Sequence, residues 1–148
     1  MLGVGNPMRR DDGVGLYVIK LLKKTLAKES SAVVKVHRPT VEPERLISEL
    51  ATARETFLIV DAVQTGADPG TIVCAPLADT KFGYFATHNI PLRLIPGVVE
   101  STDSAFVLGI EPRSVEFGEG LSPEVVAAAD RMVRRLNSMI EGERIGEL

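Results

Sequence analysis

Two aspartates and a histidine stand where their side chains could carry out chemistry. Asp12 is the second member of an adjacent pair with Asp11 and precedes a helical pattern, while Asp61 stands near the end of an apolar segment. His88 is one of two histidines in the chain. Two carboxylates and one imidazole suit a divalent transition ion with exchangeable positions left open, whereas a magnesium site rarely uses histidine. These residue types predict a transition-metal site if folding brings them together.

Each of these residues also has a purely structural interpretation. Carboxylates favour helix N-termini, where they cap backbone N–H groups and interact with the helix dipole. One member of the Asp11–Asp12 pair can therefore cap a helix while the other points into a cleft. Asp61 can equally be a surface residue at a strand end, and a single histidine such as His88 is often a structural hydrogen-bonding group.

Other kinds of site lack their sequence signatures. The Gly3-x-Gly5 pair is not a dinucleotide fingerprint, because its third glycine would fall at Met8. The sequence also has no Gly-Lys-Ser/Thr P-loop, no Gly-x-Ser-x-Gly elbow and no His-Glu-x-x-His motif. Cys74 stands inside an apolar segment without a histidine nearby, which predicts a buried structural thiol.

Length and composition predict one domain spanning residues 1–148, because 45% hydrophobic and 25% charged residues are typical of globular proteins. A net charge of −3 and the absence of tryptophan argue against nucleic-acid binding. A single cysteine excludes an internal disulfide and a cysteine-rich zinc cluster. No apolar run approaches the roughly 20 residues of a membrane span, so we expect a cytoplasmic protein without membrane insertion.

The elements that must position these side chains alternate between helical and strand patterns. Residues 14–22 have the apolar spacing of an amphipathic helix, and a shorter helix is expected at 43–50. Strand patterns cover residues 32–36, 57–62, 71–77 and 105–110. The alternation predicts an α/β fold with a mostly parallel sheet covered by helices.

The last helix has the clearest pattern. Ser122 can cap it, Pro123 suits its first turn and Gly142 can end it. We expect it to bury the apolar face made of Leu121, Val125, Val126, Ala129, Met132, Val133, Leu136 and Ile140.

The positions of the candidate residues relative to the strands favour a shared site. Ligands of open α/β sheets collect beyond the carboxyl ends of the strands. Asp12, Asp61 and His88 each stand at or after the end of an expected strand. The three side chains should therefore face one cleft at the same end of the sheet.

Several blocks in order resemble the hydrogenase maturation endopeptidases, which trim the C-terminal tail from the large subunit of nickel–iron hydrogenases. These blocks are LGVGNP at residues 2–7 with DDGVG at 11–15, LIVDA at 58–62, DPGTI at 68–72 and THNIPL at 87–92. A further block, LGIEP at 108–112, is more similar to the branch that serves formate-hydrogenlyase-type enzymes.

The resemblance implies a fold and a set of site residues. It implies a twisted five-stranded sheet between helices and a site where Asp12, Asp61 and His88 act as metal ligands and catalytic residues. It further implies that Asn6 and Asp11 shape the surrounding loop and contact the substrate. The metal would be nickel that the hydrogenase large-subunit precursor presents, so the resting site would be empty or hold another divalent ion. We expect the enzyme to be a cytoplasmic monomer.

Two routes to peptide hydrolysis remain open for such an aspartyl-type endopeptidase. Nickel can polarise the carbonyl or lower the pKa of a bound water, or a carboxylate can act as a general base while nickel serves only for recognition. A nickel metallochaperone or a small-molecule-binding α/β module without protease activity is the competing hypothesis.

Overall fold

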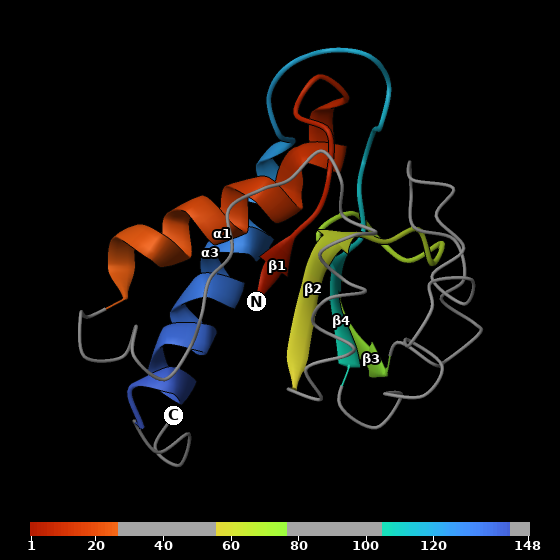
Figure 1. Ribbon diagram of the computed structural model, residues 1–148. Helices are drawn as coiled ribbons and strands as arrows, with labels where there is room; N and C mark the ends of the chain where they lie inside the picture. Colours follow the sequence, from red (N-terminus) through yellow and green to blue (C-terminus); the bar gives the residue numbers. More distant parts are fainter. Residues whose placement is uncertain (27–55, 77–104, 143–148) are drawn as a thin grey trace.

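The computed structural model describes residues 1–26, 56–76 and 105–142, and its sheet has the order β1-β2-β4-β3 (Figure 1). The strands are β1 (Leu2–Gly3), β2 (Phe57–Ala62), β3 (Ile72–Pro76) and β4 (Ala105–Ile110). A 3-10 helix, η1 (Arg10–Gly13), leads into α1 (Val14–Thr25), and α3 (Pro123–Ile140) follows β4. The α/β class is therefore confirmed.

The strand boundaries agree closely with the sequence patterns. Strands β2 and β4 cover the predicted residues, and β3 begins one residue later than the predicted 71–77, whose last residue lies outside the described part of the chain. The strand expected at 32–36 and the helix expected at 43–50 lie outside the described residues. The described part of the sheet has four strands, and the predicted fifth strand is not tested.

The direction of β3 makes the sheet mixed. Strand β2 pairs in parallel with both β1 and β4, whereas β3 pairs antiparallel with β4. Residues 63–71 are all that connect β2 to β3. A parallel return needs a crossover of roughly a dozen residues or more, so this short connection makes β3 run in the opposite direction at the sheet edge.

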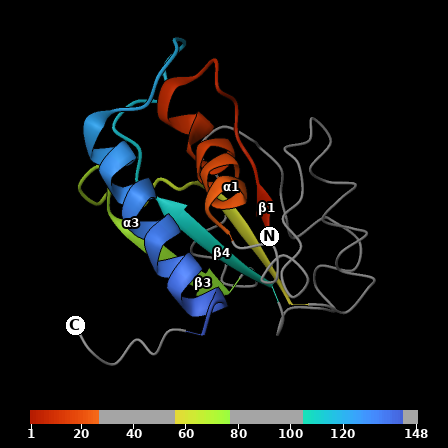
Figure 2. The same ribbon diagram turned by 90° about the vertical axis from the view of Figure 1, so that its left-hand side faces the viewer.

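Helices α1 and α3 lie side by side on the same face of the sheet (Figures 1 and 2). Their apolar stripes meet β2 and β4 in one core, in which Val18, Leu22, Val60 and Ile110 have no exposed surface. Helices on both faces were predicted, and the helix expected for the other face lies outside the described residues. Among the described residues, no helix combines the length and apolar character that crossing a bilayer requires.

The ends of α3 agree with the predicted signals, with one change in the cap. Pro123 is in the first turn, and Gly142, with φ of 75°, follows the last turn. Ser122 stands at the N-cap position, but its side chain makes no capping hydrogen bond. The buried face differs from the predicted one at Ala128 and Val126. Ala128, which was not part of the predicted face, is fully buried, while Val126, which was, is only half-buried.

Glycines let the start of α1 approach the sheet closely. A Cβ on Gly15 would lie 2.2 Å from the carbonyl oxygens of both Val4 and Val60. Gly5 has φ of 147°, and a Cβ there would lie 1.9 Å from the carbonyl oxygen of Asp12. This close packing brings η1, and with it Asp12, against the end of the sheet.

Cys74 corrects one prediction. Cys74 was predicted to be buried, but it is exposed, because it lies on strand β3 with its side chain pointing away from the core. The apolar composition of β3 indicated burial, but successive side chains of a strand point to opposite faces, so Ala75 is buried while Cys74 is exposed.

Candidate active site

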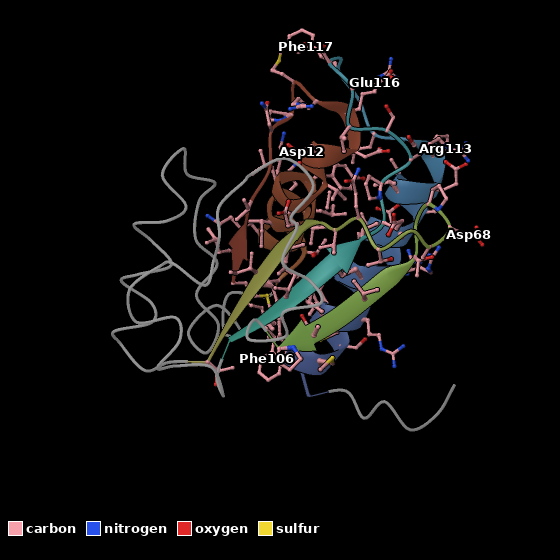
Figure 3. The ribbon with its side chains drawn as sticks, turned by 90° about the vertical axis from the view of Figure 1, so that its right-hand side faces the viewer. Asp12, Asp68, Phe106, Arg113, Glu116 and Phe117 are labelled. Atoms are coloured by element: carbon pink, nitrogen blue, oxygen red, sulfur yellow. The ribbon has the colours of Figure 1, made fainter. Side chains whose placement is uncertain are left out.

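Three buried carboxylates gather where β2 and β4 end. Asp11 and Asp12 of η1 have no exposed surface, and Asp61 of β2 is only 1% exposed. Helix η1 packs against β2, and Figure 3 shows Asp12 beyond the end of the sheet toward which β2 and β4 run. This is the end at which the sequence predicted a site.

Asp12 is held by the turn that precedes η1. The backbone N–H of Asn6 donates to Oδ2 of Asp12 at 2.9 Å. The side-chain oxygen of Asn6 accepts a hydrogen bond from the N–H of Met8, also at 2.9 Å. Asn6 therefore shapes the loop around Asp12 through its backbone and through a local turn bond, while its predicted contact with substrate is untested.

Asp61 lies in an unfavourable environment for a charge. Burial raises the pKa of its carboxyl group well above the usual 3.8, and the negative charge of Asp12 raises it further. A hydrogen bond of 2.8 Å from the N–H of Ala62 to Oδ1 works in the opposite direction and offsets only part of the increase. Asp12 and Asp61 are thus within electrostatic reach of each other.

Asp11 has a different role from the predicted one. It caps neither η1 nor α1 with its side chain. Instead its Oδ2 accepts the N–H groups of Arg113 at 2.9 Å and Ser114 at 3.0 Å. The N–H of Ser122 donates to Oδ1 of Asp11 at 2.6 Å, and the hydroxyl of Ser122 donates to Oδ2 of Asp11 at 2.8 Å. The prediction that Asp11 contacts substrate is untested, while its role in shaping the loop extends to residues 113–122.

Glu111 is a residue that sequence reasoning did not single out for the site. It is 6% exposed, and its Oε2 accepts hydrogen bonds of 2.7 Å from both the N–H and the hydroxyl of Thr65. Its Oε1 accepts a third from the N–H of Gly66 at 3.3 Å. The signal was a carboxylate immediately after β4, at the same end of the sheet as Asp61, which is the second-last residue of β2.

Backbone bonds join the loop before η1 to the loop before α3. The N–H of Gly118 donates to the carbonyl of Met8 at 2.8 Å, and the N–H of Arg10 donates to the carbonyl of Gly118 at 2.9 Å. The guanidinium Nε of Arg9 adds a bond of 3.0 Å to the carbonyl of Val115. Figure 3 shows Glu116 and Phe117 farther from the sheet than Asp12 on this joined pair of loops.

The structure therefore brings together two of the three predicted ligands. His88 lies outside the described residues, so its expected place beside Asp12 and Asp61 stays a prediction. Among the residues that the structure describes, no group of three or more His, Cys, Asp or Glu could hold a metal ion. The two buried acids fit a cation chemically, because a positive charge between them would relieve both their mutual repulsion and the cost of burial.

Comparison with known protein families identifies the group to which this chain belongs. A family model described as hydrogenase maturation protease, HycI, matches residues 16–139. The chain belongs to the hydrogenase maturation protease family. A relative from Methanocaldococcus jannaschii, provisionally named a hydrogenase maturation protease, is 29% identical and covers 95% of this chain and 87% of its own length.

Solved structures share the fold with this maturation protease. The solution structure of an endopeptidase HycI from Escherichia coli has a TM-score of 0.65 and 29% identity, covering 93% of this chain and 87% of that one. The crystal structure of a NiFe hydrogenase maturation protease HycI from Thermococcus kodakarensis has a TM-score of 0.69 and 22% identity. Its match covers 95% of this chain and 90% of that chain.

Replacement of Asp11 by Asn should destabilise the maturation protease by about 2–4 kcal/mol. The amide keeps the size of the side chain, but its NH2 group faces buried N–H donors that then lack an acceptor. Urea unfolding followed by circular dichroism measures the loss. Asp68→Asn, at an exposed position, is the matched control and should change the free energy of unfolding by less than about 0.5 kcal/mol. Equal stability of the two variants would contradict the role assigned to Asp11.

Replacement of Asp61 by Asn should stabilise the folded protein increasingly as pH rises. Because the pKa of Asp61 is raised in the folded state, that state binds its proton more tightly than the unfolded chain. The wild-type protein therefore loses stability as pH rises above 3.8 and through the folded-state pKa, whereas the Asn variant lacks this loss. Urea unfolding from about pH 4 to about pH 8 measures the difference. If the stability difference between the two proteins does not change with pH, the pKa of Asp61 is not raised in the folded state.

Proposed function

We propose that this protein is an endopeptidase that removes the C-terminal extension of a nickel–iron hydrogenase large-subunit precursor after nickel has been inserted. The observation that carries the proposal is the pair of fully buried carboxylates, Asp12 and Asp61, at the carboxyl end of the sheet in a member of the hydrogenase maturation protease family. Burial of two neighbouring acids, one of them with a raised pKa, is energetically costly and typical of functional sites, which supports this role.

Nickel in this proposal is part of the substrate. Asp12 and Asp61, together with His88, complete the coordination of the nickel centre that the precursor presents. Two carboxylates and one imidazole without a thiolate hold nickel weakly on their own, which suits a site that binds the ion only when the substrate brings it. The bound centre then places the tail beside the acids, and this proximity lowers the barrier to hydrolysis.

The acids themselves supply proton chemistry. A carboxyl group whose pKa is raised by burial, such as Asp61, can accept a proton from the attacking water and return it to the leaving amine. On this basis the proposed enzyme is an aspartyl-type endopeptidase. Nickel bound nearby also polarises the scissile carbonyl, and both effects require the two acids at the same place.

The finer features of the proposal rest on the sequence. The LGIEP block, which includes the buried Glu111, favours the branch that serves formate-hydrogenlyase-type hydrogenases. We further propose that the enzyme acts as a cytoplasmic monomer whose resting site is empty or holds another divalent ion. Its partner is then the folded precursor, and the nickel centre of that precursor is the recognition element.

Substitution of the three proposed ligands should abolish processing without unfolding the protein. Asp12→Asn, Asp61→Asn and His88→Ala should each slow removal of the tail by about 100-fold or more, because each loses a ligand to the substrate nickel. A gel assay of precursor cleavage gives the rates, and circular dichroism verifies the fold. Asp68→Asn, on the exposed loop after β2, should cleave at the wild-type rate. Full activity of His88→Ala would reject His88 as a ligand.

Cleavage should depend on the nickel content of the precursor. Metal-stripped enzyme should remove the tail from nickel-loaded precursor and leave nickel-free precursor intact, because the anchoring interaction exists only with the ion. The experiment compares the two precursor preparations on one gel at equal concentrations. If both are cut equally, nickel is not the recognition element. If the nickel-loaded tail stays attached but nickel is transferred, the protein is a metallochaperone.

A further inference from the structure

An open groove runs along α1, next to the acidic site. It has a volume of about 500 Å³. Its apolar lining comes from Pro7, Leu16, Tyr17 and Leu121, with the fully buried Ile19 between them. Pro7 is exposed and the other three are half-buried, so the groove presents partly exposed apolar surface, although Tyr17 and Leu121 also pack against the core. Such surface beside a site is typical of a place where a ligand or partner binds.

The charged residues of this groove all have the same sign. Arg10, Lys20 and Lys23 line it, and its described lining contains no carboxylate. All three cations belong to exposed residues, on a chain whose net charge is −3. The groove therefore carries positive charge on a chain of net negative charge, and this favours an anionic occupant.

Both walls of the groove belong to the segments that build the acidic site. Pro7 directly follows Asn6, whose N–H holds Asp12, and the lining residue Gly13 directly follows Asp12. On the other wall, Leu121 precedes Ser122, which donates two hydrogen bonds to Asp11. The groove and the acidic site are therefore built by the same segments of the chain and lie next to each other.

We propose that this groove docks a segment of the precursor that carries apolar side chains and at least one carboxylate. The inference rests on the function proposed above and adds a second contact beyond the nickel centre. Between Gly13 and Lys23 the groove follows the helix for about 15 Å, which accommodates about four or five extended residues. The apolar lining contacts the apolar side chains of the docked segment, and the cations bind its carboxylate.

Docking of this kind raises substrate affinity and leaves the chemical step unchanged. Exposed cations that face a carboxylate steer the encounter and act mainly on the association rate, with a strong dependence on salt. In the proposed docking role, the three cations contact the docked segment and do not contact the reacting peptide bond. Loss of the docking contact should therefore raise KM and leave kcat unchanged.

The test reverses the charge of the two lysines in the full-length protein. Lys20→Glu/Lys23→Glu is compared with Lys24→Glu/Arg131→Glu, which makes the same change in net charge at exposed positions that do not line the groove. Binding of purified, immobilised precursor is measured at low and high salt, and cleavage of nickel-loaded precursor is measured in parallel. All four substituted residues are exposed, so both variants should fold.

The groove variant should bind precursor about tenfold more weakly at low salt, lose most of the salt dependence, and raise KM with kcat within about twofold of wild type. The control variant should stay within about twofold of wild type in both assays. Equal binding by the two variants would overturn the proposal, as would a groove variant that changes only self-association on a sizing column. If wild-type protein binds precursor but never cuts it, the proposed function fails, while the binding comparison still decides the docking site.

Discussion

The carboxylate of Asp11 is the interaction on which the arrangement of the site depends. It accepts hydrogen bonds from Arg113, Ser114 and Ser122, which are about a hundred positions away along the chain, while having no exposed surface. A buried charge is tolerable only when donors surround it. The first loop, the last loop and the start of α3 are thus fixed relative to one another through one side chain.

The other buried acids divide into two kinds. Glu111, like Asp11, is surrounded by donors and orders the loop that follows β2 through Thr65 and Gly66. Asp61 instead accepts a hydrogen bond from Ala62 while facing the charge of Asp12, and its pKa rises accordingly. A buried acid whose pKa is raised by burial and by a second acid is the kind of perturbed group that is typical of functional sites.

Tight backbone packing fixes the start of α1 against the sheet, next to the buried acids. Gly15 allows α1 to contact the carbonyl groups of Val4 and Val60, so the helix start is fixed against β1 and β2. The same packing leaves the outer side of α1 free to form the cationic groove beside the site. One helix thereby follows the turn that carries Asp12 and also carries Lys20 and Lys23, so the proposed docking groove lies next to the acidic site.

The sequence by itself determined most of the described elements and the end of the sheet at which Asp12 and Asp61 lie. Strands β2 and β4, the limits of α3 and the positions of Asp12 and Asp61 followed from local periodicity, caps and strand ends, which are short-range properties. Only the tertiary structure decided the direction of β3 and the partners of Asp11. Hydrogen bonds between residues far apart in the chain leave no local pattern, so an acid that looked like a helix cap became the link between two distant loops.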